Sequence, residues 1–355
     1  MKNLKKLTGI LLALTLVAGV VGCGDSKDNN VKTETEVTET ATDNTDESGS
    51  NDTTELKKVV IGTTGLDGSL TENAAIAQKE SFFEEELEKV GYYPEYQAFA
   101  QAGPAINEAF SSKAIDFAAY GDLPAVTAKS NGIDIKVIAT TSSNMGYSVV
   151  IDNDLEISSI ADLKGKKVVV GFGTAPYKYF SDLLEKNGLT LEDVEIVNSA
   201  TDGPTMLPAK QADAFVTAEG PALLYQASGI GKVFDTSDVA DELSSLFVLA
   251  GRTEFIEENP EVAQALVTAL QRAYEFAQEN PDKVYEDLAT DSFPAEIQKQ
   301  VYNDTSFVGF NPEIDEKTVE KTEGLVAFLK ANSIITNDVA VDEFLDTSVY
   351  EKAVQ

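Results

Sequence analysis

The sequence has no histidine, no tryptophan and a single cysteine, Cys23. Without histidine the chain cannot build a Ser-His-Asp triad, a Cys-His pair or a His-ligated metal site. One cysteine cannot form a disulfide within the chain, because that bond joins two cysteines. Catalysis by carboxylates, lysine or tyrosine remains open, but the composition favours a binding protein over an enzyme. We therefore expect no cofactor and no bound metal.

Basic residues are scarce as well. The chain has 27 Lys and Arg residues against 60 Asp and Glu residues, which gives a formal net charge of −33. Arginine occurs only at Arg252 and Arg272. A surface this acidic repels nucleic acid and anionic lipid head groups, so we expect no nucleic-acid partner. The net charge does not identify a small ligand, because a helix N-terminus can bind an anion inside a negative protein.

The first residues predict export from the cytoplasm. Three lysines precede an apolar run over 7–21, which ends in Gly22 and Cys23. A basic end, a short apolar stretch and small residues before a cleavage site are typical of a secretory signal. The segment resembles the lipobox of bacterial lipoproteins, in which the cysteine is lipidated. We therefore expect 1–22 to be a signal peptide and Cys23 to anchor the chain, through acyl chains, to the extracytoplasmic face of the cell membrane. An ordinary signal peptide with an incidental cysteine is the alternative.

Residues 24–57 differ in composition from the rest of the chain. They are rich in Thr, Asp, Glu, Asn and Ser and contain few apolar residues. Such a segment cannot bury enough apolar surface to offset the entropy lost on ordering. We expect 23–57 to be the lipidated cysteine followed by a disordered acidic tether. The body, from Lys58 to Gln355, has roughly 300 residues, enough for two lobes with separate cores.

Short apolar strands alternate with amphipathic helices in the body. The predicted strands are 59–62, 93–99, 115–119, 135–139, 148–151, 167–171, 194–197, 213–216 and 246–250. The predicted helices are 81–90, 106–113, 123–130, 177–187, 204–210 and 221–227. This alternation predicts an α/β fold with mostly parallel sheets covered on both faces. After Ala250 the pattern is helical, beginning with Asn259 as an N-cap and Pro260 in the first turn.

Several motifs occur in an order that this alternation does not explain. They are Ala102-Gly103-Pro104, Tyr120-Gly121-Asp122-Leu123-Pro124, Asp162-Leu163-Lys164-Gly165-Lys166 and Gly171-Phe172-Gly173-Thr174. The order resembles solute-binding proteins of ABC importers, in the branch for nitrate, taurine, aliphatic sulfonates and thiamine-pyrimidine precursors. The resemblance covers nearly all of residues 58–330. It implies the two-lobed type II periplasmic-binding-protein fold, with a ligand cleft between the lobes and two hinge crossings. Lobe one would be 58–146 plus 246–355, and lobe two 147–245.

The resemblance also implies a function and its partners. The chain would capture a small polar solute (sulfonate- or taurine-like, nitrate-like or pyrimidine-like) and deliver it, as a monomer, to the membrane subunits of an ABC importer. It would have no catalytic activity. A sensor or adhesin built on the same fold is an alternative. An enzyme of thiamine-pyrimidine synthesis is a weaker one, because such enzymes need reactive His or Cys residues.

Candidate ligand-binding residues are found at the ends of the predicted strands. In open α/β sheets, ligands bind beyond the carboxyl ends of the strands, where the free N–H groups of helix N-termini attract anions. Three loops qualify, over 63–65, 120–122 and 171–175. Two of them face each other only if the lobes close. The candidates are Thr63, Thr64, Gly65, Gly121, Asp122, Thr141, Ser142, Thr174, Ala175 and Glu219. We expect the ligand between the Gly121-Asp122 loop and the helix that starts at Thr174-Ala175.

The roles of the polar candidates stay open at this point. Asp122 and Thr174 are good N-caps, and each can instead meet a ligand. Glu219 is either a solvated surface acid or a residue beside the ligand. Carboxylates disfavour a bare anion through like-charge repulsion, so a zwitterion or a nitrogenous ring fits these acids better. Whether Arg252 reaches the cleft is open, whereas Arg272 is expected at the surface.

Overall fold

The computed structural model describes residues 55–291, 293–302 and 307–355. The predicted signal peptide, Cys23 and nearly all of the predicted tether lie outside the described residues, so those assignments stay predictions. Within the described ranges, none of the helices combines the length and the hydropathy that crossing a bilayer requires.

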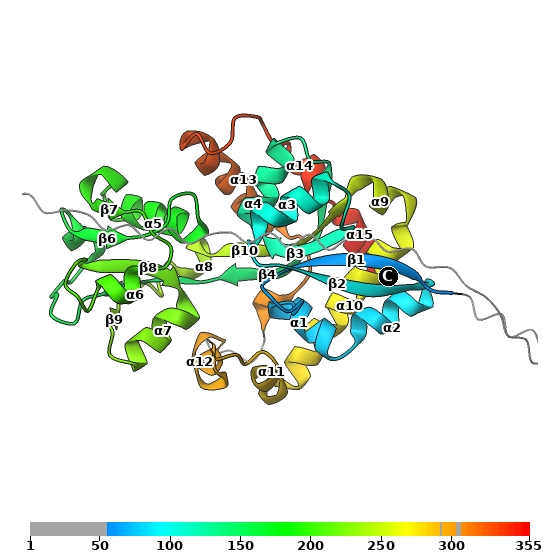
Figure 1. The fold of residues 1–355 in the computed structure, drawn as a ribbon, viewed down its shortest axis with the longest axis horizontal. Coiled ribbons are helices and arrows are strands. Elements are labelled where there is room, and N and C mark those ends of the chain that lie inside the picture. Colours follow the sequence, from blue (N-terminus) through cyan, green and yellow to red (C-terminus); the bar gives the residue numbers. More distant parts are fainter. Residues whose placement is uncertain (1–54, 292, 303–306) are drawn as a thin grey trace, which may run out of the picture. The chain divides into compact units, whose positions relative to one another are not determined.

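One sheet has the strand order β2-β1-β3-β10-β4 (Figure 1). Its strands are β1 (Lys57–Thr64), β2 (Tyr92–Phe99), β3 (Phe117–Gly121), β4 (Ile135–Met145) and β10 (Ser245–Arg252). β1 pairs in parallel with β2 and β3, whereas β10 runs antiparallel to β3 and β4. We call this the first sheet; its edge near Thr64 and Gly121 is where the parallel strands end.

The second sheet has the order β7-β6-β8-β5-β9. Its strands are β5 (Tyr147–Ile151), β6 (Lys167–Val169), β7 (Glu195–Val197), β8 (Ala214–Ala218) and β9 (Lys232–Val233). β6 pairs in parallel with β7 and β8, whereas β5 runs antiparallel to β8 and β9. Two sheets flanked by helices confirm the predicted α/β fold class.

The chain passes between the two sheets twice. β4 ends at Met145 and β5 begins at Tyr147, and the return runs through helix α8 (Ala240–Leu243) to Ser245, where β10 begins. Each of these crossing strands enters its new sheet at the edge where the parallel strands end, so it must run against them. The prediction of mostly parallel sheets is therefore correct for strands that alternate with helices and wrong for β5 and β10. The predicted lobe boundaries stay a prediction.

Helices flank both sheets. Those before the second crossing are α1 (Glu72–Lys79), α2 (Phe82–Lys89), α3 (Gly103–Ser111), α4 (Asp122–Ser130), α5 (Ala175–Lys186), α6 (Gly203–Met206) and α7 (Glu219–Ala227). Those after β10 are α9 (Thr253–Glu258), α10 (Pro260–Glu279), α11 (Pro281–Asp287), α12 (Ala295–Val301), α13 (Glu316–Ala331), α14 (Val341–Phe344) and α15 (Thr347–Ala353). Three short 3₁₀ turns complete the described elements: η1 (Ile160–Leu163), η2 (Leu191–Asp193) and η3 (Val308–Phe310).

Alternation along β1 divides the core of the first sheet into two faces. Val59 and Ile61 pack with α1, α2 and α10, whereas Val60 packs with α3, α4 and α13. α10 begins after Asn259, as predicted, and the apolar stripe on that helix is buried in the first of these clusters. The helices thus hold the sheet from both sides and leave its strand ends free to carry loops.

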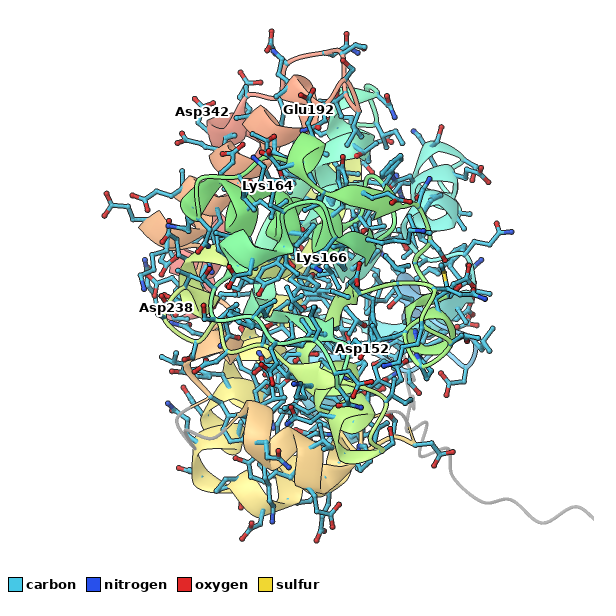
Figure 2. The ribbon with its side chains drawn as sticks, turned by 90° about the vertical axis from the view of Figure 1, so that its left-hand side faces the viewer. Asp152, Lys164, Lys166, Glu192, Asp238 and Asp342 are labelled. Atoms are coloured by element: carbon cyan, nitrogen blue, oxygen red, sulfur yellow. The ribbon has the colours of Figure 1, made fainter. Side chains whose placement is uncertain are left out.

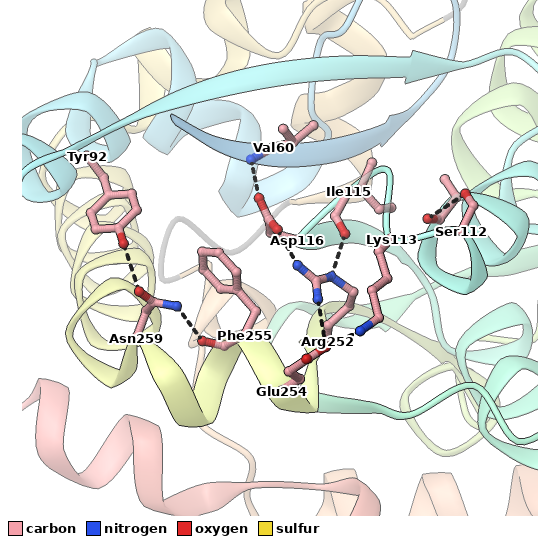
Figure 3. A network of polar contacts seen from close by, with 11 residues as sticks. Val60, Tyr92, Ser112, Lys113, Ile115, Asp116, Arg252, Glu254, Phe255 and Asn259 are labelled. Atoms are coloured by element: carbon pink, nitrogen blue, oxygen red, sulfur yellow. Dashed lines mark hydrogen bonds and ion pairs between the residues drawn. The ribbon is translucent and has the colours of Figure 1, made fainter. Parts of the chain in front are cut away.

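Arg252 lies at the end of β10 away from the crossings (Figure 3). Its Nη2 pairs with Asp116 Oδ1 at 2.7 Å, and its Nε donates to the carbonyl of Ile115 at 3.0 Å. Asp116 Oδ2 in turn accepts a hydrogen bond from the N–H of Val60 at 2.9 Å. This network joins β10 to β1, so Arg252 is a structural residue and does not reach the cleft. Arg272 is partly buried rather than simply exposed, because it pairs with two glutamates of α2.

Candidate functional site

A cavity of about 800 Å³ lies where helices of the two sheets begin. Gly121 and Asp122 line it from the start of α4, which follows β3 of the first sheet. Thr174 and Ala175 line it from the start of α5, which follows β6 of the second sheet. The structure therefore brings together the four residues that the sequence analysis placed on opposite sides of a cleft.

Much of the remaining wall of this cavity is apolar. Leu123, Ile133, Phe247 and Ile334 contribute to it, together with Tyr147 at the start of β5. The Tyr147 hydroxyl is hydrogen-bonded to Ser245 Oγ at 2.6 Å, so it is tied to the second crossing. A concave, mostly apolar site with a few polar groups is the usual form of a small-molecule site.

Both carboxylate oxygens of Asp122 are engaged by the protein itself. Oδ1 accepts a hydrogen bond from the N–H of Leu123 at 2.7 Å, and Oδ2 accepts one from the N–H of Leu246 at 3.1 Å. The residue is only 7% exposed, and burial raises its pKa to about 6, although the two backbone bonds act in the other direction. The N-cap of α4 is Gly121, so the prediction of Asp122 as the cap is wrong by one residue. Asp122 ties α4 to β10.

Thr174 is the N-cap of α5, which confirms one of its two predicted roles. Its Oγ1 accepts a hydrogen bond from the N–H of Tyr177 at 3.3 Å and donates one to the carbonyl of Gly171 at 2.7 Å. The hydroxyl is therefore fixed by the loop that precedes the helix. Thr174 lines the cavity, and its hydroxyl caps the helix.

A second cavity, of about 360 Å³, adjoins the first because Asp122 and Ala175 line both. Lys178 of α5 and Lys321 of α13 also line it. Lys321 Nζ donates to the carbonyl of Ser143 at 2.7 Å and to Ser244 Oγ at 2.6 Å. Burial lowers the pKa of Lys321. One lysine of α13 thus binds the chain at both crossings.

Six of the predicted residues do not line either cavity: Thr63, Thr64, Gly65, Thr141, Ser142 and Glu219. Thr63 and Thr141 are fully buried, and their hydroxyls have no hydrogen-bond partner in the described part of the chain. Gly65 is held at the end of β2, because its N–H donates to the carbonyl of Phe99 at 3.3 Å. Thr63, Thr64 and Gly65 lie at the end of β1, as predicted, whereas Thr141 and Ser142 lie within β4, which continues to Met145. Their role as ligand contacts stays a prediction.

Glu219 is the first residue of α7 and lies at the first crossing. Its N–H donates to the carbonyl of Gly146 at 3.0 Å, and a Cβ on Gly146 would lie 2.5 Å from Glu219 Oε2. Burial raises the pKa of Glu219. Among the described residues, none forms a hydrogen bond or an ion pair with this carboxylate. Glu219 is half-buried, so both of its predicted roles stay open.

The surface of the second-sheet part carries charged side chains, several of which Figure 2 labels. Lys164, Glu192 and Asp238 are exposed there. Asp152 is paired with Lys210 at 2.6 Å. In the described residues, no group of acidic or cysteine side chains could hold a metal ion.

Sequence reasoning missed several residues of the site. Ser245 and Phe247 belong to β10, which returns from the second sheet, and Lys321 belongs to a helix far along the chain. No local motif marks them. The only sequence signal was the position of the predicted strand over 246–250 next to the expected crossing.

The two sheets, the double crossing and the cavity between helix starts define a protein of the periplasmic-binding-protein class. Residues 74–284, more than half of the chain, match the NMT1/THI5 like family. The chain belongs to this family. The resemblance stated from the motifs is thereby confirmed.

Individual relatives carry names of binding proteins. A protein of Brucella abortus (strain 2308), named as a candidate binding protein, is 27% identical over 60% of this chain and 65% of its own length. The match thus spans less than two thirds of that relative. The taurine-binding periplasmic protein of Escherichia coli (strain K12) is 28% identical over 59% of this chain and 65% of its length. A candidate thiamine biosynthesis protein of Haemophilus influenzae is 22% identical over 76% of this chain and 85% of its own length.

Solved structures agree with the fold. The structure of a candidate periplasmic sulfonate-binding protein, SsuA, from Methylobacillus flagellatus KT superposes with a TM-score of 0.76 at 28% identity, covering 84% of this chain and 94% of that one. The desulfurization enzyme DszB has a TM-score of 0.68 at 15% identity, over 84% of this chain and 99% of that one. The second likeness shows the fold alone, so one fold serves binding proteins and an enzyme.

Proposed function

We propose that this chain is a lipid-anchored, extracytoplasmic solute-binding protein that delivers a small polar solute to the membrane subunits of an ABC importer. We take 58–146 plus 246–355 as one lobe, 147–245 as the other, and the protein as a monomer. The observation that carries the proposal is the cavity of about 800 Å³, whose walls come from helix starts of both sheets. A solute there touches both lobes, so its binding favours the closed form.

The relatives support the class of solute. Their names refer to taurine and to sulfonates, which are small and polar and have short apolar parts. The apolar wall formed by Phe247 and Ile133, next to the polar start of α5, suits such a molecule. Anchoring at Cys23 would keep the protein beside its importer at the outer face of the membrane.

A ligand screen by thermal unfolding tests this proposal. The purified protein is mixed with taurine, alkanesulfonates, nitrate, pyrimidines and amino acids. A ligand at about 100 times its Kd stabilises the folded state by about 2.7 kcal/mol. For a chain of this size the midpoint should rise by several degrees, since about 1 kcal/mol corresponds to roughly 2–4 °C. Small-angle scattering should show a smaller radius of gyration with the same ligand.

Two matched variants locate the effect. Ala175 lines both cavities, so Ala175→Phe should remove the stabilisation by the ligand. Ala227→Phe makes the same change at the exposed end of α7 and should leave it intact. Equal stabilisation of both variants would place the ligand elsewhere. An unchanged radius of gyration at saturation would contradict closure.

A further inference from the structure

A tyrosine connects the first helix of the first sheet with α7 of the second. Glu72, the first residue of α1, accepts a hydrogen bond from the Tyr302 hydroxyl at 2.5 Å. The Tyr302 ring packs against Phe293, with ring centroids 6.2 Å apart. Phe293 presses on Gly220 of α7, where a Cβ would lie 2.5 Å from a ring carbon of Phe293. Glu219 directly precedes Gly220. Glu72 and Glu219 therefore lie at opposite ends of the contacts that run through Tyr302 and Phe293.

Among the described residues, no lysine or arginine pairs with either carboxylate. Burial raises the pKa of Glu72 and of Glu219, and no lysine or arginine of the described chain lowers either value. Burial, with the charges of the two acids, raises the pKa of Tyr302 well above its usual range. One hydroxyl therefore experiences a carboxylate from each sheet. Half-buried carboxylates without a cation cost free energy, which a bound cation would offset.

Two buried hydroxyls give independent evidence for a missing ligand. Ile61 and Ala139 belong to the core cluster that α1 covers, and α1 packs against β4. Because side chains alternate along a regular strand, Thr63, two residues after Ile61, faces the same side. Thr141 lies at a β-bulge between Thr140 and Ser142, where this alternation is interrupted. Both residues are 0% exposed, and neither hydroxyl has a partner in the described part of the chain. Buried polar groups are nearly always hydrogen-bonded, so these two indicate a group that the protein does not itself supply.

We propose that Glu72 and Glu219 form a subsite for a cationic nitrogen group of the solute, such as a protonated amine or amidine. This inference rests on the proposed function and narrows the solute class. A cation between the acids is attracted to one carboxylate of each sheet and so favours closure. Thr63 supplies an oxygen acceptor on the first-sheet side. A solute that carries only negative charge meets repulsion here, whereas a zwitterion or a cation does not.

Titration calorimetry with matched probes tests the subsite. The probes are taurine against isethionate and benzylamine against benzyl alcohol, which differ in carrying ammonium or hydroxyl. The ammonium member of at least one pair should bind at least tenfold more tightly than its hydroxyl partner. Glu219→Gln should remove this preference, because it keeps the shape and loses the charge. Glu72→Gln should do the same, since a glutamine oxygen still accepts the Tyr302 hydrogen bond.

Glu192→Gln is the control, because Glu192 is an exposed acid far along the chain from both residues. It removes the same charge and should leave the preference unchanged. A preference that survives in Glu219→Gln overturns the subsite. Equal binding of ammonium and hydroxyl probes, or solutes of the wider screen that bind without a cationic nitrogen, also overturns it while the proposed function stands. If no compound of either set binds, both proposals fail.

Discussion

Replacing Asp122 by asparagine should change how stability depends on pH more than it changes stability at neutral pH. The Asp122 pKa is about 6 in the folded protein, because burial outweighs the two backbone hydrogen bonds, against 3.8 when unperturbed. Asp122 binds its proton more tightly in the folded protein than in the unfolded one, so protonation stabilises the fold. This stabilisation is complete at pH values below the unfolded-state pKa. That contribution is lost as the pH rises through about 6. The difference between these two pKa values corresponds to about 3 kcal/mol in the free energy of unfolding.

The asparagine variant lacks this titration but loses an acceptor. Asp122 accepts hydrogen bonds from the N–H groups of Leu123 and Leu246, and an asparagine has only one oxygen to offer. A buried N–H without a partner costs about 1–3 kcal/mol. At pH 7 this loss and the relief from a buried charge nearly offset each other, so the variant should lie within about 2 kcal/mol of the parent. At pH 4 the parent should gain about 2 kcal/mol relative to the variant.

Urea unfolding of both proteins at pH 7, 6, 5 and 4 measures this difference. All other carboxylates are common to the two proteins, so their titration cancels in the comparison. Two stability curves that stay parallel from pH 7 to pH 4 would refute the reasoning. Ligand affinity at pH 7 should change less than about threefold, because the carboxylate serves the backbone. A loss of tenfold or more, about 1.4 kcal/mol, would instead make Asp122 a ligand contact.

Three further outcomes are expected. Arg252→Met should destabilise the fold by about 3 kcal/mol in urea unfolding, because it leaves Asp116 largely buried and unpaired; equal stability would contradict the network. Gly203→Ala should lower the thermal midpoint, since its Cβ would lie 2.5 Å from the Phe215 ring; an unchanged midpoint would show that the ring can move aside. Cys23→Ser should move the protein from the membrane fraction to the soluble one, and a variant that stays in the membrane would argue against the anchor.

Most of the strands and the larger helices could be predicted because they carry uninterrupted local signals. The buried run at 59–62 and the strand over 135–139 were placed correctly, and each proved longer, since flanking polar residues still pair in the sheet. Helix α1 was missed. Its buried face consists mainly of alanines with one isoleucine, which give a weak apolar pattern. The crossing strands β5 and β10 were predicted, but their antiparallel direction was not, because direction depends on where a strand enters the sheet.

The residues of the site likewise differ in whether the sequence could predict them. Gly121 and Thr174 could be predicted because helix starts that follow strands lie at a known edge of the sheet. Glu72 and Tyr302 could not, because they are 230 residues apart in the chain and neither belongs to a motif. Lys321 likewise meets Ser143 and Ser244 only through the fold. Long-range contacts of single side chains leave no periodic trace in the sequence.

Asp122 and Glu219 differ in whether the protein itself supplies hydrogen-bond donors to their carboxylates. Sequence reasoning counted both Asp122 and Glu219 as acids that disfavour a bare anion. In the structure, the protein itself supplies hydrogen-bond donors to both oxygens of Asp122. It supplies none to the carboxylate of Glu219 in the part of the chain that the structure describes. A ligand cation would have to compete with backbone N–H groups at Asp122, whereas at Glu219 it would meet an unpaired charge. Discrimination between cationic and purely anionic solutes should therefore depend on Glu219 and hardly at all on Asp122.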